Sequence, residues 1–210
     1  MYLGRIVAAG MSRSGIVSVV YRVSSRSFPN REAKVMEKGI AIVPKQGFEK
    51  DIFVNPYIAY NCLRMAGDWA VATNGSQTDP IAEKILSGMS PRDAFALSML
   101  ALDYEKDNYN TPRISAAANG KMKKIVLGIV RKDYLQVSEM DCEPGKLFYV
   151  STYEHNFISE KHCDNKFDSE SESDACEYIM SKGVFAGFTN PVTSAAAVFK
   201  NSKFVAAIKG

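Results

Sequence analysis

The sequence predicts an α+β fold in which antiparallel sheets are stacked in layers and covered by helices. Its β-branched segments come in groups joined by short turns, as in antiparallel sheets, and do not alternate with helices as in βαβ folds. Only three segments carry clear helix signals. The chain has 210 residues, of which 46% are apolar and 23% charged. These values suit a globular protein with a substantial core, so we expect a single domain spanning residues 1–210.

Strand signals dominate the first half of the chain. Leu3–Ala9 and Ile16–Val23 are β-branched runs separated by Gly10 and Gly15, so we expect them to form a hairpin. Further strands are expected at Gly39–Val43, Tyr57–Met65 and Trp69–Thr73, the last two joined by a turn at Gly67-Asp68.

Two helices should follow these strands. Asp79 is the expected N-cap of the first, with Pro80 at its first position and Gly88 just past its end. Ser90 should cap the second in the same way. This second helix carries Ala94–Leu102, which is apolar nearly all round, so we expect it to be buried on most sides.

The second half returns to strands and adds one more helix. We expect that helix at Ser173–Ser181, closed by Gly183. The acidic, serine-rich stretch Asp164–Asp174 in front of it is expected to be an exposed loop. The expected strands are Arg113–Ala117, Lys124–Val130, Tyr134–Glu139, Lys146–Ser151, Thr193–Phe199 and Phe204–Ile208.

Charge and hydropathy argue against several classes of protein. The formal net charge of +3 is too small to indicate nucleic-acid binding. The longest apolar stretches are about ten residues, too short to span a bilayer. The N-terminus shows no charged-then-apolar signal pattern, so we expect a cytoplasmic protein without a membrane segment.

The usual motifs for cofactors and metals are also missing. There is no GxGxxG or P-loop sequence, and we expect no cofactor. His155, His162 and Cys163 are interpreted as part of a solvated loop, and no metal site is expected there. The four cysteines are scattered and are expected to be free thiols. Acid–base chemistry would therefore come from carboxylates, tyrosines, lysines or bound water.

Three stretches contain more polar side chains than a fold requires. Tyr21–Arg31 (YRVSSRSFPNR) has three arginines and three serines, which can surround a phosphate or form a basic surface loop. Asn55–Cys62 (NPYIAYNC), as a strand, would place Tyr57 and Asn61 on one face, where they either line a pocket or belong to the core. Leu102–Arg113 leaves the buried helix and is either a site held by a rigid element or a solvated helix end.

These three stretches resemble the archaeal-type IMP cyclohydrolases. The similarity rests on YRVSSRSFPNR, on NPYIAYNC with the following NGSQTDPIAEK, and on DYEKDNYNTPRI. The opening MYLGRIVAAG and the closing FAGFTNPVTSAAA are similar too. The likeness is nearly continuous over Met1–Ile129 and returns over Phe185–Ala197, whereas Val130–Lys182 matches only weakly, around Ser151–Glu154.

The resemblance implies a four-layer αββα sandwich like that of the N-terminal-nucleophile hydrolases. Those amidohydrolases expose a Cys, Ser or Thr as the first residue of the mature chain. Here Tyr2 follows Met1, so that nucleophile is absent and the chemistry should differ although the fold is shared.

The activity implied by the resemblance is the dehydrative closure of the second purine ring, which converts 5-formamidoimidazole-4-carboxamide ribonucleotide to IMP. This would be the last step of de novo purine biosynthesis, with a purine ribonucleotide as the small-molecule partner. The enzyme must hold the carboxamide and formyl groups together, move protons, and stabilise charge on the formyl oxygen.

Roles within the matching motifs follow from that chemistry. Glu105 is expected to be the general base or to position the carboxamide, and Tyr60 or Tyr57 to donate a proton to the formyl oxygen. Asn61 would orient the amide, and Lys106 would balance charge near the base. The residues expected to bind the 5′-phosphate and stabilise charge are Arg22, Ser25, Arg26 and Arg31, with Asn108 and Arg113 as base or ribose contacts.

Two other functions remain compatible with the sequence. One is an amidohydrolase of the same fold, which would need an internal nucleophile exposed by processing. The other is a protein that binds the nucleotide without turning it over. The sequence does not determine the oligomeric state, and a homo-oligomer is one alternative. For His155–Ser173 the alternatives are a lid, a subunit contact or neither.

Overall fold

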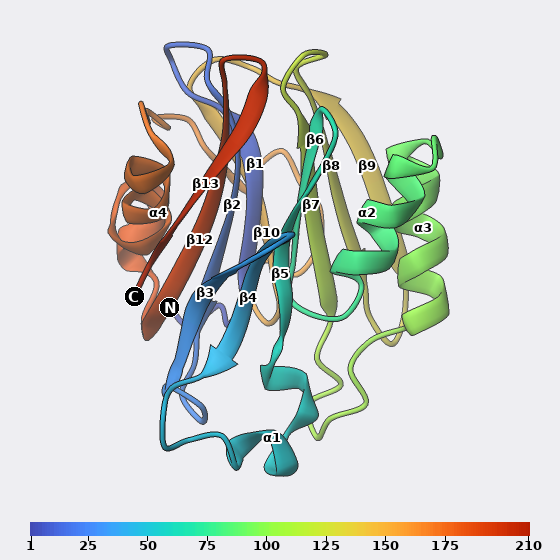
Figure 1. Cartoon of the computed structure of the whole chain (residues 1–210), viewed down its shortest axis with the longest axis vertical. Helices are drawn as coiled ribbons and strands as arrows, with labels where there is room; N and C mark the ends of the chain where they lie inside the picture. Colours follow the sequence, from blue (N-terminus) through green and yellow to red (C-terminus); the bar gives the residue numbers. More distant parts are fainter.

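The computed structural model describes the whole chain, from Met1 to Gly210. Two antiparallel sheets lie face to face, with helices on both outer sides (Figure 1). The six-stranded sheet has the order β11-β10-β1-β2-β12-β13 and the seven-stranded sheet runs from β3 to β9 in sequence order.

The strands of the six-stranded sheet are β1 (Ile6–Met11), β2 (Val17–Ser24), β10 (Lys146–Ser151), β11 (Cys163–Asp164), β12 (Pro191–Lys200) and β13 (Lys203–Lys209). Those of the seven-stranded sheet are β3 (Arg31–Met36), β4 (Gly39–Pro44), β5 (Tyr60–Ala66), β6 (Trp69–Thr73), β7 (Arg113–Asn119), β8 (Lys124–Val130) and β9 (Leu135–Asp141).

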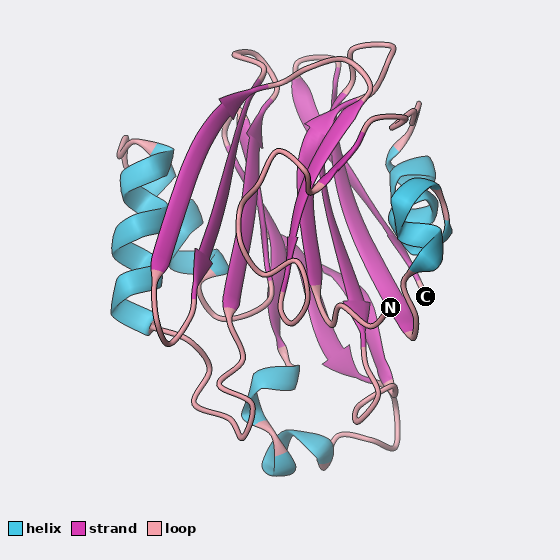
Figure 2. Ribbon diagram, turned by 180° about the vertical axis from the view of Figure 1, so that it is seen from behind, coloured by secondary structure: helices cyan, strands magenta, loops and turns pink.

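Helices cover the outer face of each sheet. On one side α4 (Glu172–Ser181) packs on β2, β12 and β13, and the 3-10 helix η2 (Gly183–Gly187) follows it. On the other side α2 (Thr78–Leu86) packs on β5, and α3 (Pro91–Leu102) packs on β8 and β9. Figure 2 shows this order of helix, sheet, sheet and helix from behind. The predicted α+β fold with four layers is therefore confirmed, and the likeness to N-terminal-nucleophile hydrolases stays a prediction.

The largest part of the hydrophobic core lies between the two sheets. It is a cluster of 26 buried residues, to which Val7 and Val19 contribute from one sheet and Ala72 and Leu127 from the other. Smaller clusters lie under α4 and under α2 and α3. Removing a ring from such a cluster, as in Phe95→Ala, should cost about 3–5 kcal/mol. The two sheets thus form a rigid base for the loops at their ends.

Several predicted elements are confirmed. β1 and β2 form the expected hairpin, in which Ile6 pairs with Arg22. Ser90 caps α3, since its hydroxyl oxygen accepts a hydrogen bond from the backbone N–H of Asp93 at 3.2 Å. The four cysteines are free thiols.

Other local predictions are wrong. Asp79 lies in the first turn of α2, one residue beyond its start at Thr78, and its carboxylate accepts bonds from Asn61 and Arg64 rather than capping the helix. The predicted strand from Tyr57 begins only at Tyr60, because Pro56 opens the short 3-10 helix η1 (Pro56–Ile58). The strand β3 and the short helix α1 (Asp51–Val54) were not predicted.

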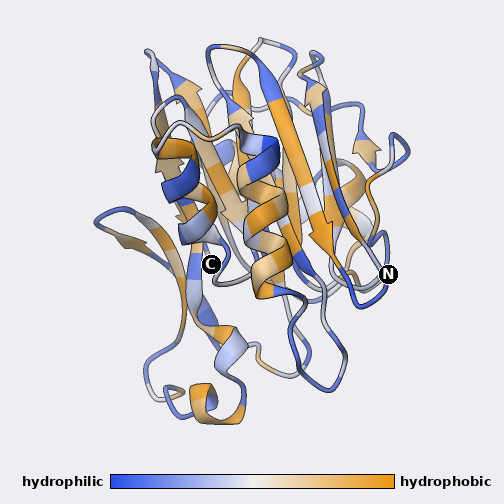
Figure 3. Ribbon diagram, turned by 90° about the vertical axis from the view of Figure 1, so that its right-hand side faces the viewer, coloured by the Kyte–Doolittle hydropathy of each residue, from blue (hydrophilic) through white to orange (hydrophobic).

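Burial is also distributed differently from the expectation for two segments. α3 buries one face only: Leu97 and Leu100 are 50% and 69% exposed, and Figure 3 shows much apolar colour on the helix layer facing the viewer. The region around His162 is not a solvated loop, because His162, Cys163 and Phe167 are all buried. No helix is long and apolar enough to cross a membrane.

Candidate active site

The candidate site lies where the core between the sheets ends in polar side chains. Side chains alternate along a strand, so the face of β1 that carries Val7 and Ala9 into the core also carries Arg5, one residue before the strand. In the same way Tyr21 lies on the inner face of β2, and Arg31 shares the inner face of β3 with Ala33.

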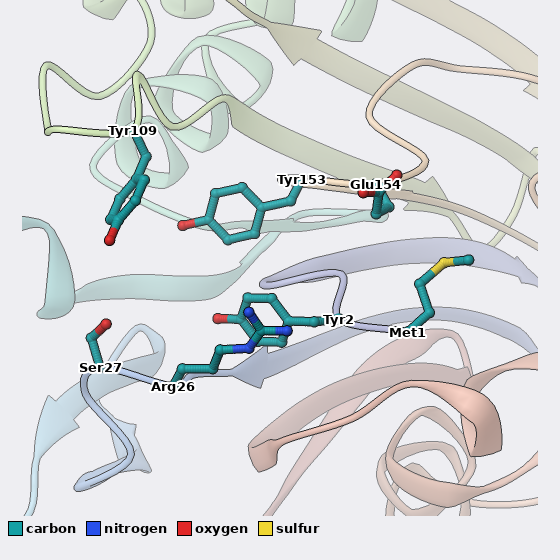
Figure 4. Close-up of a pocket in the computed structure, with 7 residues that line it drawn as sticks. All are labelled: Met1, Tyr2, Arg26, Ser27, Tyr109, Tyr153 and Glu154. Carbon is teal, nitrogen blue, oxygen red and sulfur yellow. The ribbon is translucent and has the colours of Figure 1, made fainter.

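Two adjoining cavities open at this end of the sheets. The larger, of about 400 Å³, lies among the aromatic rings of Tyr2, Tyr109 and Tyr153 and the side chain of Arg26 (Figure 4). The smaller, of about 50 Å³, shares those three tyrosines and is also lined by Arg5, Ser25 and Arg31. Its size admits a small polar group but not a nucleotide.

Glu105 is the buried carboxylate of this region. It is 1% exposed, and its Oε2 forms an ion pair with Nη2 of Arg5 at 2.8 Å. Its Oε1 accepts a hydrogen bond from Nδ2 of Asn74 at 3.3 Å. Burial raises the pKa of Glu105, and the charges of Arg5 and Arg113 oppose that rise. The result is a carboxylate fixed at both oxygens whose pKa lies above its ordinary value.

A short loop holds Glu105 in place. The backbone N–H of Glu105 donates to the carbonyl of Thr111 at 2.8 Å. The carboxylate of Asp107 closes the same loop by accepting bonds from the backbone N–H and the hydroxyl of Thr111. The loop leaves α3 at Asp103, whose positive φ of 56° turns the chain back toward β7.

Polar side chains behind Glu105 form a connected network. Oδ1 of Asn74 accepts from Nε2 of Gln77 at 3.0 Å and from the backbone of Ile114 at 2.8 Å. Oε1 of Gln77 accepts in turn from Nη1 of Arg113 at 3.2 Å. Asn74 and Gln77 are fully buried, so this network limits the positions that Glu105 can adopt.

Two tyrosines meet across the gap between the sheets. The hydroxyls of Tyr21 and Tyr60 are 2.5 Å apart. Burial raises the pKa of Tyr60, and the charges of Arg31 and Arg5 act against the rise. Burial also raises the pKa of Tyr21, well above its ordinary value. Tyr60 therefore stays protonated at neutral pH and can act as a proton donor.

The arginines that face the cavities have unused donors. Nε of Arg31 donates to the carbonyl of Phe28 at 3.1 Å, while Nη1 is buried without a partner. Nε of Arg5 is likewise buried and unpartnered. Arg26 is exposed and lies over the ring of Tyr2 at 4.1 Å. An unmade buried hydrogen bond costs about 1–3 kcal/mol, so these groups are poised to receive an anionic or carbonyl oxygen.

Arg22 does not belong to this group of arginines. It follows Tyr21 in β2 and so points to the opposite face of the sheet, toward α4 and η2. There its Nη1 donates to the carbonyls of Ile179 and Phe185, and its Nη2 to that of Phe188. Its Nε donates to the hydroxyl of Ser24. This geometry corrects the prediction that Arg22 binds phosphate, because its donors are already used inside the protein.

Asn61 is also misplaced by the prediction. It follows Tyr60 in β5 and points to the outer face of that sheet, where its Nδ2 donates to Asp79 at 2.9 Å. Its amide is thus bonded to Asp79 on the outer side of the sheet, whereas both cavities lie on the inner side, so it cannot orient a substrate amide there.

The other predicted residues surround the site. Tyr57, Lys106 and Asn108 line a hollow of about 500 Å³ that shares Tyr109 and Ser27 with the two cavities. The hydroxyl of Tyr57 accepts a bond from the backbone N–H of Lys106. Ser25 accepts from the backbone N–H of Phe28 at 3.0 Å. Arg113 donates through Nε to the carbonyl of Asp103, beside Glu105.

Sequence reasoning missed Arg5, Tyr21 and Asn74 as site residues. A signal existed for Arg5, because a charged residue shares the strand face of Val7 and Ala9 and must find a partner if buried. Asn74 lies inside the NGSQTD segment, but nothing in its spacing indicates a contact with Glu105.

Comparisons with known proteins identify the family. A family model described as "IMP cyclohydrolase-like protein" matches residues 2–203. The chain belongs to this family. Relatives named IMP cyclohydrolase include one from Methanosphaera stadtmanae, which is 50% identical over 96% of both chains. Another, from Methanocaldococcus jannaschii, is 38% identical over the full length of both chains.

Membership of the IMP cyclohydrolase-like family confirms the resemblance seen in the polar motifs. The match also runs through Val130–Lys182, where the sequence motifs gave only a weak likeness. That segment supplies Tyr153 to both cavities and the buried cluster around His162, so it is part of the same fold.

Proposed function

We propose that this protein is an IMP cyclohydrolase of purine biosynthesis, which closes 5-formamidoimidazole-4-carboxamide ribonucleotide to IMP with loss of water. The observation that carries the proposal is the buried carboxylate of Glu105, paired with Arg5 near Tyr60 and a cavity sized for the reacting groups. The name shared by the relatives supports the same reaction.

The reaction joins two groups of one molecule. The carboxamide nitrogen attacks the formyl carbon, an N–C bond forms, and the carbonyl electron pair moves onto oxygen. Dehydration then removes that oxygen as water, with one proton from the carboxamide nitrogen and one from the formamido nitrogen. Because the groups are tethered, the protein must mainly align them, move protons and stabilise the oxyanion.

Glu105 is the proposed general base. It accepts the proton of the carboxamide nitrogen during attack and returns it to the departing oxygen. A pKa raised toward neutrality by burial suits this role, since a base works best when its pKa is near the working pH. Asn74 and Arg5 hold the carboxylate so that it meets the nitrogen in one orientation.

Tyr60 is the proposed proton donor to the formyl oxygen, and Arg31 stabilises the charge on that oxygen. Tyr60 keeps its proton at neutral pH, since the ordinary pKa of a tyrosine is about 10 and burial raises it further. After dehydration the proton of the formamido nitrogen restores the tyrosine, so the protein returns to its starting state. The unpartnered Nη1 of Arg31 supplies a charged donor in the same region.

The phosphate is proposed to bind nearer the surface. Arg26 is exposed at the larger cavity, with Ser25 at the smaller one beside it. Lys106 and Asn108 line the neighbouring hollow together with Tyr57 and are proposed ribose or phosphate contacts. Arg113 is proposed to act indirectly, through its charge near Glu105.

The test is direct turnover. Purified protein, treated with a chelator, is mixed with the synthetic formylated ribotide, and IMP formation is followed by ultraviolet absorbance. We expect metal-independent conversion far above the rate without protein. No conversion, together with tight IMP binding by calorimetry, would instead indicate a nucleotide-binding protein that has lost the chemistry. If the protein shows neither turnover of the ribotide nor binding of IMP, the proposed function is contradicted.

A further inference from the structure

We propose that Arg5 is a further catalytic residue, which holds Glu105 through one guanidinium nitrogen and donates a hydrogen bond from another to the oxygen that becomes negative during ring closure. This inference rests on the proposed function. A single side chain would thus bond both the general base Glu105 and the oxyanion.

The unused donors of Arg5 are the first observation. The residue is 8% exposed, yet its guanidinium makes a single hydrogen bond, from Nη2 to Glu105. A guanidinium carries five N–H donors, and Nε of Arg5 is buried without any partner. A buried charged group so poorly bonded is costly to the folded protein, and an incoming oxygen would relieve that cost.

The position of Arg5 is the second observation. It lines the cavity of about 50 Å³ together with Arg31, whose Nη1 is also unpartnered and buried. Two arginines with unpartnered buried nitrogens therefore line one small space. The space admits a small polar group and not a whole nucleotide. On the proposed function that group is the formyl group, whose oxygen gains negative charge.

The rigid shape of the guanidinium links this oxygen to Glu105. Nε and Nη2 are neighbours in one planar group, so an oxygen bonded to Nε lies beside the carboxylate bonded to Nη2. Ring closure needs these two groups side by side, because the nitrogen that loses its proton and the oxygen that gains charge are both bonded to the formyl carbon. In the addition step Glu105 takes the proton from nitrogen, the carbonyl pair moves to oxygen, and Arg5 donates to that oxygen without losing its own proton.

The charges around Glu105 define what the loss of Arg5 would change. The groups that act on this carboxylate are Arg5 from the segment before β1, Arg113 from β7 and Asp107 from the loop, with the amide of Asn74 as a neutral donor. Arg5 and Arg113 favour the ionised form and Asp107 opposes it. Removing the charge of Arg5 should therefore raise the pKa of Glu105 further.

The experiment compares Arg5→Lys and Arg5→Gln with a matched control. Arg64→Lys is that control: Arg64 is 8% exposed, is ion-paired with Asp79 and Glu83, and has an unpartnered Nε, but it lines neither cavity. For Arg5→Lys we expect kcat to fall about 10²–10³-fold with KM nearly unchanged, the range seen when an oxyanion donor is lost. Arg64→Lys should retain the wild-type kcat.

Two further readouts separate a catalytic role from a structural one. The acid limb of the kcat–pH profile should move to higher pH in Arg5→Gln, and added guanidinium ion should restore part of its kcat. If Arg5→Lys does not fold, as judged by circular dichroism, Arg5→Gln decides by the same measurements. Full kcat in a folded Arg5 variant, or no shift of the acid limb and no rescue, overturns the inference while leaving the proposed function intact. Absence of turnover in the wild-type protein contradicts the proposed function instead.

Discussion

Arg5 and Arg22 are buried near the same end of neighbouring strands, yet their surroundings differ in kind. Ile6, next to Arg5, pairs with Arg22 across the hairpin, so the two arginines lie close along the sheet but on opposite faces. Arg22 reaches the helix layer and donates to carbonyls of α4 and η2. Arg5 points into the space between the sheets, and its side chain bonds only to Glu105.

The difference shows how a structural arginine can be told from one that meets a ligand. Burial does not separate them, because both are nearly inaccessible. Unused donors combined with a place at a cavity do: Arg22 is fully engaged by the protein, whereas Arg5 and Arg31 keep buried nitrogens without partners and line the smaller cavity.

Glu105→Gln should reduce kcat about 10²–10⁴-fold, because an amide cannot accept the proton from the carboxamide nitrogen. Binding of IMP should be largely kept, since Arg26 and Ser25, the proposed phosphate contacts, are unchanged. Steady-state kinetics and calorimetry with IMP check both parts. A variant with full cyclisation rate would remove Glu105 from the mechanism.

The pH dependence follows from the same carboxylate. Glu105 must be ionised to act as a base, so kcat should fall as the pH drops through its pKa. Because burial raises that pKa, the acid limb should lie above the value of about 4.3 typical of an exposed glutamate. A profile that stays flat down to that ordinary value would argue that another group is the base.

Arg31→Lys should lower kcat about 10²–10³-fold if its free nitrogen meets the oxyanion, because a lysine cannot place a donor at the same point. The thermal stability should change little, since only the bond to the carbonyl of Phe28 is lost. Kinetics with parallel thermal unfolding test this. Loss of stability equal to that of an Arg22 variant would place Arg31 in the structural class instead.

Arg22→Met should have the opposite profile. It leaves several buried carbonyls of α4 and η2 without donors, each costing about 1–3 kcal/mol, so the free energy of unfolding should fall by about 3 kcal/mol or more. The kcat and KM of the folded fraction should stay at wild-type values. Chemical denaturation and kinetics measure the two effects, and weaker substrate binding would return Arg22 to the phosphate site.

The arginines of the YRVSSRSFPNR segment also show what the sequence could predict. Its motifs led to the family, and its strand pattern led to layered antiparallel sheets. Within YRVSSRSFPNR, however, one arginine supports a helix layer, one is exposed over Tyr2 and one faces the cavity. That division depends on the face of each strand and on the place where β3 begins, and β3 was not predicted.

The same limitation explains why the predictions for the NPYIAYNC segment are partly wrong. Strand alternation counted from Tyr57 is wrong, because the strand begins at Tyr60 after a 3-10 turn. The prediction therefore placed Asn61 on the face of the site, although it points to the outer face of the sheet. It also did not identify Tyr21 as the partner of Tyr60. Tyr21 was missed because it is 39 residues away in sequence and comes close only when the sheets stack.

The smallest expected effect belongs to that tyrosine pair. Tyr21→Phe removes the hydroxyl that is 2.5 Å from Tyr60 but keeps the buried ring. A neutral hydrogen bond contributes about 0.5–1.5 kcal/mol, so kcat should fall only about 2–10-fold, and Tyr60→Phe should be far more damaging because it removes the proton donor itself. If both variants lose activity equally, the two hydroxyls act as one unit and Tyr21 shares the proton transfer. If kcat falls more in Tyr21→Phe than in Tyr60→Phe, the proton donor is Tyr21. The inner face of β2 then carries the general acid, and Tyr60 of the opposite sheet only bonds to it.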